Sequence, residues 1–448
     1  MLNTSLSRRR WLAGTGAASL LTRLEWMNAF AQSTTPDYKA LVCIFLAGGN
    51  DGHNTVVPLT QAQFNAYKAA RGSLALPDGN TGPFLQVSTP DGTPYGLNSG
   101  LAAIHPLWAQ GKFAVLANTG MLMQPVTRTQ FLANNVPLPT NLFSHADQAQ
   151  QMQSGIASTS GGTGWGGRAA DLVQPLNGAS SFPAALSMSG PSLFCTGSVI
   201  RSASLFPGFN LTASGMQIWP QNAADARVAG LQQVLQFDNG MVLVQAANQA
   251  RKDAASLNQM LAGTATTVNT PFPGTNLGNQ LKQVAQIIKI RSAIGLRRQV
   301  FLCTIGGFDT HSAQSWNHWD LLKQTSEALL AFYNATTELG VADGVTSFTL
   351  SDFGRSLQPS GTGSDHGWGN HHLILGGAVQ GGKMYGTFPA PALGGPDDCG
   401  TRGTLIPTTS TDQYGATLAN WFGVPGNQLT SVFPNLGKFA NPNLGFLG

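Results

Sequence analysis

The chain has few charged residues and few cysteines for its length. Lys, Arg, Asp and Glu make up only 10% of the 448 residues, and the four cysteines lie far apart. Because no two of them form a Cys-x-x-Cys pair, a zinc ribbon and a thioredoxin-type redox motif are excluded. Cys43 and Cys303 lie within apolar runs and are expected in the core. Cys195 and Cys399 could form a disulfide in an oxidising compartment.

Several catalytic motifs and any long apolar run are also missing. The absence of Gly-x-Ser-x-Gly argues against an ordinary serine esterase, and without a Walker A motif nothing supports binding of nucleotide phosphates. The sulfatase motif is absent: no Cys or Ser is followed by Pro two places later and Arg four places later. At Cys399, the Arg (Arg402) comes one place too early. No run after the N-terminus approaches the roughly 20 residues of a membrane helix, so we expect no membrane span in the mature protein.

The N-terminus carries an export signal. Ser7-Arg8-Arg9-Arg10-Trp11-Leu12 places paired arginines ahead of a mild apolar stretch, and Ala29-Phe30-Ala31 suits a small-residue cleavage site. This pattern predicts a twin-arginine signal peptide over residues 1–31. We therefore expect a periplasmic or secreted protein whose transient partner is the twin-arginine (Tat) translocon.

Removal of the signal leaves a chain that is almost neutral. Residues 1–31 hold four of the 24 basic and one of the 20 acidic residues, so 20 basic and 19 acidic residues remain. No basic patch is left to bind phosphates, and nucleic acid is not an expected partner. The 54 glycines indicate many turns and loops that can approach a ligand closely.

Strands and helices are expected to alternate along residues 38–448. This order predicts a single α/β domain with a mostly parallel central sheet and helices on both faces. The turn-rich stretch from about Gly178 to Gly274, with one helical segment near Ala223–Leu261, is expected to be an insertion at the sheet edge. The predicted strands are Tyr38–Ala47, Phe113–Ala117, Gln299–Thr304, Val345–Leu350 and Leu373–Leu375, and the main predicted helices lie near 281–294, 319–339 and 412–422.

Acidic residues follow three of these strands. Asp51, Asp309 and Asp352 each stand at a strand end, and His311 lies two places after Asp309. One such Asp usually caps the next helix, but ligands of open α/β sheets bind beyond the carboxyl ends of the strands. A glycine-rich segment, residues 364–372, adds three histidines. His and Asp together suit a divalent ion such as zinc, manganese or calcium.

Five ordered motifs resemble those of the domain-of-unknown-function family 1501. They are Gly-Gly-Asn-Asp-Gly-His-Asn-Thr at 48–55, Phe-Ser-His at 143–145, Gly-Gly-Phe-Asp-Thr-His at 306–311, Ser-Asp-Phe-Gly-Arg at 351–355 and Asp-His-Gly-Trp-Gly-Asn-His-His at 365–372. The resemblance covers nearly the whole mature chain. That family is similar in fold to the alkaline phosphatase superfamily, whose members hydrolyse phosphate or sulfate esters, while its own activity is not settled.

The resemblance implies a metal site and a nucleophile. Ser144 corresponds to the nucleophile position, and Phe353 stands where phosphatases have a histidine. His371 or His145 would then have to supply the imidazole of a second metal ion. The implied metal ligands are Asp51, Asp309, His311, Asp352 and His366, with His371 as a further candidate.

Two of these assignments have a simpler structural alternative. Ser144 could be only a helix N-cap, and Arg355, which could grip the oxygens of an ester, could instead form a structural ion pair. The expected function is thus metal-dependent hydrolysis of a phosphate or sulfate ester, of a small molecule or glycan, assisted by one or two ions. The alternative is a non-catalytic exported protein that keeps the fold and a structural ion and binds a glycan or surface partner.

Overall fold

A computed structural model describes most of the chain after the predicted signal peptide, which lies outside the described residues. The chain divides into two compact units, Met1–Tyr38 and Lys39–Gly448, and the second contains the fold. The described residues are 37–79, 81–158, 162–180, 182–200, 202–207, 219–237, 240–241, 244–245, 248 and 267–448.

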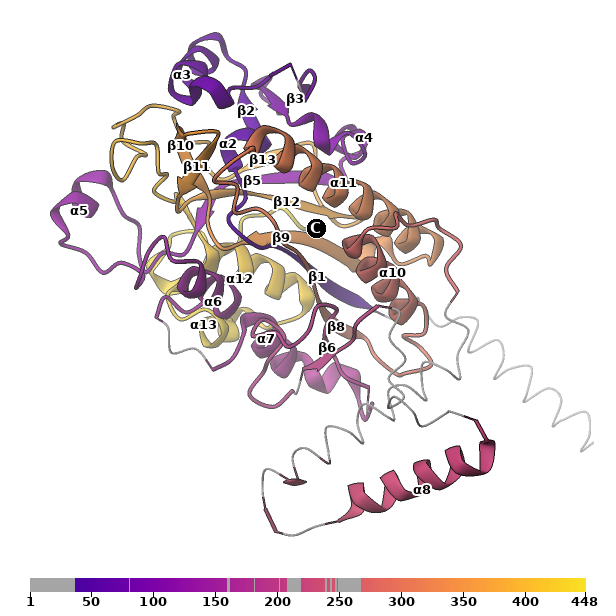
Figure 1. Ribbon diagram of the computed structural model, residues 1–448. Coiled ribbons are helices and arrows are strands. Elements are labelled where there is room, and N and C mark those ends of the chain that lie inside the picture. The colour runs from indigo at the N-terminus through magenta and orange to yellow at the C-terminus, as the bar shows by residue number, and fades with distance from the viewer. Residues whose placement is uncertain are drawn as a thin grey trace, which may run out of the picture. The chain divides into compact units, whose positions relative to one another are not determined.

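A nine-stranded sheet forms the centre of the Lys39–Gly448 unit (Figure 1). Strand β12 pairs antiparallel with both of its neighbours, and every other pairing in the sheet is parallel. The predicted α/β class with a mixed, mostly parallel sheet is confirmed. In spatial order the strands are β13 (Met384–Tyr385), β5 (Phe113–Gly120), β12 (Asn370–Gly376), β9 (Val345–Ser351), β1 (Lys39–Leu46), β8 (Arg298–Ile305), β6 (Ala185–Ser187) and β7 (Ala203–Ser204), while β14 (Thr409–Ser410) pairs with β5.

Helices cover both faces of this sheet (Figure 1). Strand β1 is buried almost throughout, as a continuous apolar run flanked by two parallel strands should be. On one face lie α10 (Asn276–Lys289) and α11 (Gln314–Glu338), and on the other α7 (Trp165–Val173) and α12 (Thr411–Phe422). The other α-helices of the described residues are α2 (Gly52–Thr55), α3 (Gln61–Arg71), α4 (Pro106–Ala109), α5 (Arg128–Ala133), α6 (His145–Ser154), α8 (Gln221–Gln236) and α13 (Leu429–Val432).

The register of the central strands brings three strand ends together. Leu46 at the end of β1 lies opposite Ile305 of β8 on one side and Ser351 of β9 on the other. Because these strands are parallel, the residues that follow each of them emerge at one rim of the sheet. A hairpin of β10 (Arg355–Ser360) and β11 (Gly363–His366) stands directly after β9 at this rim.

Two smaller regions complete the fold. Strands β2 (Val56–Pro58), β4 (Pro94–Leu97) and β3 (Leu85–Ser88) form a separate antiparallel sheet. Between Gly178 and Gly274, β6 and β7 extend the main sheet beyond β8, and α8 covers the first part of the expected helical segment. Most of 237–266 lies outside the described residues, so the insertion stays a prediction.

All four cysteines are free and buried. Cys43 and Cys303 lie on β1 and β8, in the core as predicted. Cys195 and Cys399 form no disulfide, and Cys399 packs in an apolar cluster with Leu122 and Trp368.

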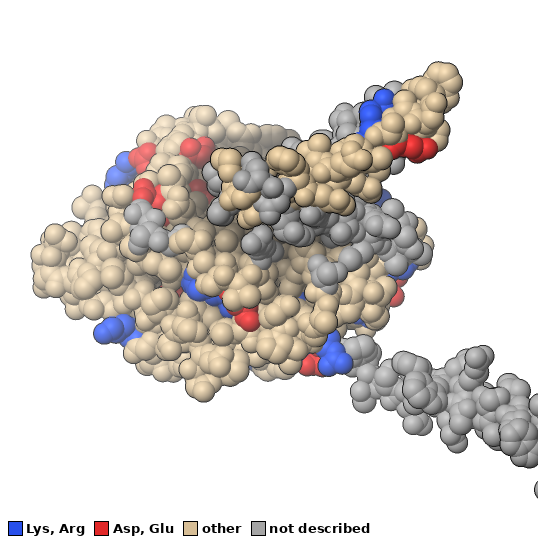
Figure 2. Space-filling model, turned by 90° about the horizontal axis from the view of Figure 1, so that it is seen from below, with Lys and Arg blue, Asp and Glu red and all other residues tan. Residues whose placement is uncertain are grey.

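Charged side chains are sparse and of both signs on the face drawn in Figure 2. Within the described part of the chain, no helix is both long enough and apolar enough to cross a membrane.

Helix α12 buries one acidic side chain without full compensation. Asp412 is inaccessible to solvent. Its Oδ1 accepts a hydrogen bond from the Asn435 amide at 3.0 Å, and its Oδ2 has no partner among the described residues. Burial raises the pKa of Asp412 from 3.8 to about 7. In the unfolded chain the carboxyl ionises near its ordinary value, so folding becomes less favourable as the pH rises from about 4 to 7.

We therefore expect Asp412→Asn to remove this loss of stability. Relative to the wild type, the variant should gain stability as the pH rises through this window, by up to roughly 4 kcal/mol above pH 7, and should differ little at pH 4. Urea unfolding of both proteins at several pH values measures the difference. A gap that does not change with pH would contradict the assignment.

Candidate metal site at the sheet rim

Four side chains converge where the strands end. Asp309 and His311 follow β8, His366 ends β11, and His145 opens α6. Their side chains are between 28% and 47% exposed, so the cluster faces solvent on one side. Glycine permits this crowding, because a Cβ on Gly48 would come within 2.4 Å of the Asp309 amide nitrogen.

The ring nitrogens and one carboxylate oxygen lie at ligand spacing. His366 Nε2 lies 3.1 Å from His145 Nε2 and 3.0 Å from His311 Nε2. Asp309 Oδ1 lies 3.3 Å from His145 Nε2, 2.9 Å from His311 Nε2 and 3.6 Å from His366 Nε2. His145, Asp309 and His366 form a group that could hold a metal ion, and no other such group occurs among the described residues.

The outer nitrogens of two rings fix their protonation. His366 Nδ1 lies 2.7 Å from the carbonyl oxygen of Phe143, which can only accept, so Nδ1 carries the hydrogen. His145 Nδ1 donates in the same way to Asp352 Oδ2 at 2.7 Å. When both rings are neutral, their Nε2 atoms present lone pairs to each other, an arrangement that a cation between them stabilises.

Burial acts on the charges of these groups. It lowers the pKa of His366 more than the hydrogen bond to Phe143 raises it, which favours the neutral imidazole that metals bind. Burial also raises the pKa of Asp352 against the opposing effect of His145. The Gly48 amide donates to Asp352 Oδ1 at 3.2 Å and holds this carboxylate in place.

The backbone is strained just before His145. Phe143 has φ of +71°, a left-handed conformation that is costly for an aromatic residue. Its amide donates to Gln148 Oε1 at 2.5 Å, and its carbonyl is the one that binds His366. The strained residue thus aims the acceptor that orients one imidazole.

The guanidinium of Arg355 is held by other residues of the protein. Its side chain is inaccessible to solvent and donates to the carbonyls of Gly48 and Ser364 and, at 3.0 Å, to Asp309 Oδ1. Burial would raise the pKa of Asp309, but this bond and the charges of His145 and His311 outweigh it, and the pKa is lowered. The geometry is that of the structural ion pair.

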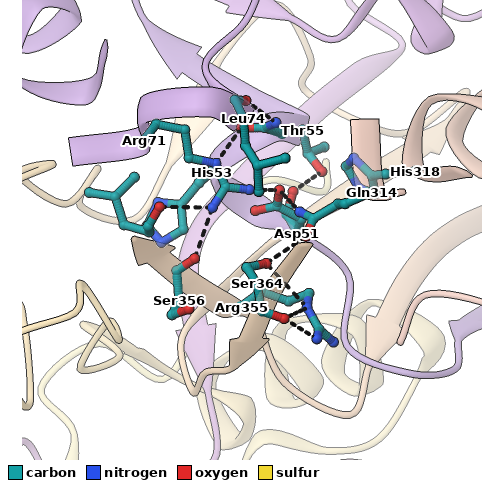
Figure 3. A network of polar contacts seen from close by, with 12 residues as sticks. Asp51, His53, Thr55, Arg71, Leu74, Gln314, His318, Arg355, Ser356 and Ser364 are labelled. Atoms are coloured by element: carbon teal, nitrogen blue, oxygen red, sulfur yellow. Dashed lines mark hydrogen bonds and ion pairs between the residues drawn. The ribbon is translucent and has the colours of Figure 1, made fainter. Parts of the chain in front are cut away.

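Asp51 lies in a buried network instead of the cluster (Figure 3). Its carboxylate forms an ion pair with Arg71, both side chains being inaccessible, and accepts from Gln314 Nε2 at 2.5 Å. Burial alone would raise the pKa of Asp51, but Arg71 and the other neighbouring charges lower it. This carboxylate therefore already has an internal cation.

The same network continues through Gln314 and Ser364 to Arg355 (Figure 3). Gln314 Oε1 accepts from Ser364 Oγ at 2.7 Å, and the Ser364 carbonyl accepts from Arg355 Nε at 3.0 Å. Arg355 in turn holds Asp309. Asp51 is thus linked to Asp309 through a chain of hydrogen bonds, although it is not part of the cluster.

Ser144 and His371 lie outside the cluster as well. Ser144 is the N-cap residue of α6, but its hydroxyl makes no capping bond and donates to Asp147 Oδ2 at 2.6 Å. His371 is buried, accepts from the Asn118 amide at 3.0 Å and lies against the Phe388 ring. Its Nε2 has no hydrogen-bond partner among the described residues.

The structure thus gathers part of the set expected from sequence. Asp309, His311 and His366 meet in the cluster, and Asp352 contacts it by accepting a hydrogen bond from His145. His145, considered only as a supplementary imidazole, is also a member of the cluster. The sequence marked Phe143 only as part of the Phe-Ser-His motif, without its strained conformation. Nothing in the sequence indicated that Arg71 is the partner of Asp51.

Fold and cluster together define an α/β protein with a mixed, mostly parallel sheet and a His/Asp group at its rim. The chain belongs to the family described as protein of unknown function (DUF1501), whose model matches residues 38–398. The resemblance predicted from the five motifs is confirmed at the level of this family, while the export signal stays a prediction.

The solved structures that follow are only distantly similar to the chain. No curated protein matches the chain. PsFucS1 sulfatase from Pseudoalteromonas sp. is 9% identical, with 91% of this chain and 72% of that one covered and a TM-score of 0.36. The soluble domain of lipooligosaccharide phosphoethanolamine transferase A from Neisseria meningitidis is 9% identical, with 88% and 90% covered and a TM-score of 0.33. Ps i-CgsB in complex with k-i-k-neocarrahexaose is 11% identical, with 90% and 77% covered and a TM-score of 0.36.

We expect Arg71→Met to destabilise the protein by about 3–5 kcal/mol, because it leaves the buried Asp51 carboxylate without its cation. The double variant Asp51→Asn/Arg71→Met should recover part of this loss, since no buried charge then remains unpaired. Urea unfolding measures both. Lys323→Met, which removes one partner of the exposed Lys323–Glu327 pair at 3.9 Å, serves as the control and should change stability by less than about 1 kcal/mol.

Proposed function

We propose that the protein is a metal-dependent hydrolase of phosphate or sulfate esters, of a small molecule or glycan, that acts after export by the twin-arginine route. One observation carries this proposal: His145, His311 and His366 direct ring nitrogens at one carboxylate oxygen of Asp309 within 3.6 Å. Ligands of a tetrahedral zinc ion stand at about this spacing from one another.

The donor set favours some ions over others. Imidazole nitrogens with one carboxylate suit zinc, and also manganese, whereas calcium takes oxygen ligands. His145, Asp309 and His366 would hold the ion, with His311 in reach. We propose one ion and not two, because Asp51 is paired with Arg71 and His371 accepts from the Asn118 amide outside the cluster.

Supporting contacts and solvent access fit a reactive site. A divalent ion supplies Lewis-acid chemistry, polarising an ester and acidifying water. Asp352 and the Phe143 carbonyl keep the outer ring nitrogens protonated and the inner ones free to bind. The half-exposed Asp309 and His311 leave one side of the cluster open to a substrate.

Ser144 is the proposed nucleophile. It directly precedes the ligand His145, is partly exposed, and its hydroxyl is not used for capping α6. That hydroxyl donates to Asp147, whose pKa is lowered by this bond and by Asn141. The carboxylate is ionised at neutral pH and holds the hydroxyl through a charge-assisted hydrogen bond.

A second function is favoured by one observation. Asp51 is paired with Arg71 and Arg355 with Asp309, which leaves a single ion site and no free guanidinium from the resembled set. This suits a non-catalytic exported protein that keeps one structural ion and binds a glycan or a surface partner. Hydrolysis across a panel of phosphate and sulfate esters separates the two functions.

We expect the purified protein to bind one equivalent of zinc or manganese. Asp352→Asn should weaken this affinity by roughly 10–100-fold, because His145 loses its charged acceptor. His366→Ala and Asp309→Ala should weaken it further. Calorimetric titration with the metal measures each affinity.

His105→Ala is the matched control for these variants, because His105 lies away from the cluster and bonds only the Gln86 carbonyl among the described residues. Its metal affinity should equal that of the wild type. Wild-type affinity in His366→Ala would refute the site.

We expect Ser144→Ala to lower kcat for an ester substrate by ~10²-fold or more while metal content stays unchanged. The reason is that the variant loses the attacking oxygen but no ligand. Steady-state kinetics with elemental analysis of the same sample provide the measurement. Full activity in this variant would instead identify water as the nucleophile.

A further inference from the structure

An anionic ester at this cluster needs a positively charged side chain that is accessible to it. Asp309, Asp352 and Asp365 line or support the cluster, and Arg355 is fully engaged with its own carboxylate and two carbonyls. Without an additional cation, the carboxylates would repel the substrate.

Arg402 is the half-exposed guanidinium beside the cluster. Its side chain is 43% exposed, and Nη1 lies 2.6 Å from Asp365 Oδ2. Asp365 Oδ1 in turn lies 3.7 Å from His311 Nδ1, the ring nitrogen that faces away from Asp309. Arg402 is thus joined to the cluster through one carboxylate, at its solvent-facing side.

The backbone beneath Arg402 is rigidly held. Its carbonyl accepts from the Gln358 amide at 2.9 Å, on strand β10. The neighbouring carboxylate of Asp398 accepts from four backbone amides, those of Gly394, Gly400, Gly403 and Thr404, at 2.8 to 3.1 Å. The guanidinium therefore projects from a fixed loop, and only its side chain has to move toward a ligand.

We propose that Arg402 binds the anionic group of the substrate and that Asp365 is its internal competitor, which the substrate anion displaces. The inference rests on the proposed function for the identity of the substrate. A planar guanidinium can hold two oxygens of a phosphate or sulfate at once. With Asp147 beside Ser144, four carboxylates stand against two guanidiniums, so the surroundings are formally −2, and a divalent ion brings them to 0. The metal therefore favours anion binding.

The two partners should respond to mutation in opposite directions. Loss of Arg402 removes the anion's binding group. Loss of the Asp365 charge frees Arg402 and removes a like charge from the anion's path. A residue that is merely structural would weaken binding in both variants.

The test is binding of inorganic phosphate to the full-length protein, loaded with zinc or manganese, by isothermal titration calorimetry. Arg402→Gln should weaken the phosphate affinity by about tenfold or more, and Arg402→Lys should fall between the two because it keeps the charge without the fork. Asp365→Asn should tighten binding several-fold. Metal-free wild type should bind phosphate at least about tenfold more weakly than the loaded protein.

Arg128→Gln is the matched control. Arg128 donates to the Gly400 carbonyl at 3.0 Å, so it contacts the same loop without touching Asp365. Its removal changes the net charge equally and should leave the phosphate affinity within about twofold. Elemental analysis confirms equal metal content in all variants.

The outcomes separate the two proposals. Wild-type phosphate affinity in Arg402→Gln, weaker binding in Asp365→Asn, or no phosphate binding by the metal-loaded wild type would each overturn the role of Arg402. If the wild type binds metal and phosphate through Arg402 but hydrolyses no ester, the anion site stands and the proposed hydrolase fails.

Discussion

The parallel register of three central strands is the constraint on which the site depends. β1, β8 and β9 end side by side, with Leu46 opposite both Ile305 and Ser351. Residues more than 250 positions apart in the chain therefore leave the sheet at one rim, and the loops after the strands need only a few residues to bring polar side chains into contact. The hairpin β10–β11 and the start of α6 then add His366 and His145 to what the strands supply.

Much of this could be predicted from the sequence, because strand ends are marked by local patterns. The apolar runs that end shortly before Asp309 and Asp352 predict that both carboxylates lie at the rim. The glycine-rich segment after β9 marks His366 as a candidate ligand. His145 was harder to assign, since it opens a helix and no strand pattern leads to it. Its place in the cluster depends on its hydrogen bond to Asp352, and the left-handed Phe143 orients the neighbouring His366. Neither contact can be predicted from the local sequence.

Asp51 and Arg355 show where sequence patterns stop being informative. Both stand at the rim, as expected, but what a buried charge does is decided by its partner. Arg71, on α3, reaches Asp51 from another part of the fold, and Arg355 turns inward to Ser364 and Asp309. Neither pairing can be predicted from the spacing of residues in the sequence, because ion pairs require only proximity in space. Gln314 then joins the two pairs through Ser364.

The three imidazoles of the cluster come from three separate segments: the helix α6, the loop after β8 and the hairpin β10–β11. A single ion held by them would act as a cross-link of the rim, while the apolar core beneath would remain as it is. Binding of the ion would accordingly stiffen these segments locally and would not change the fold. Loss of the ion would release these three segments from one another and leave the sheet beneath them intact.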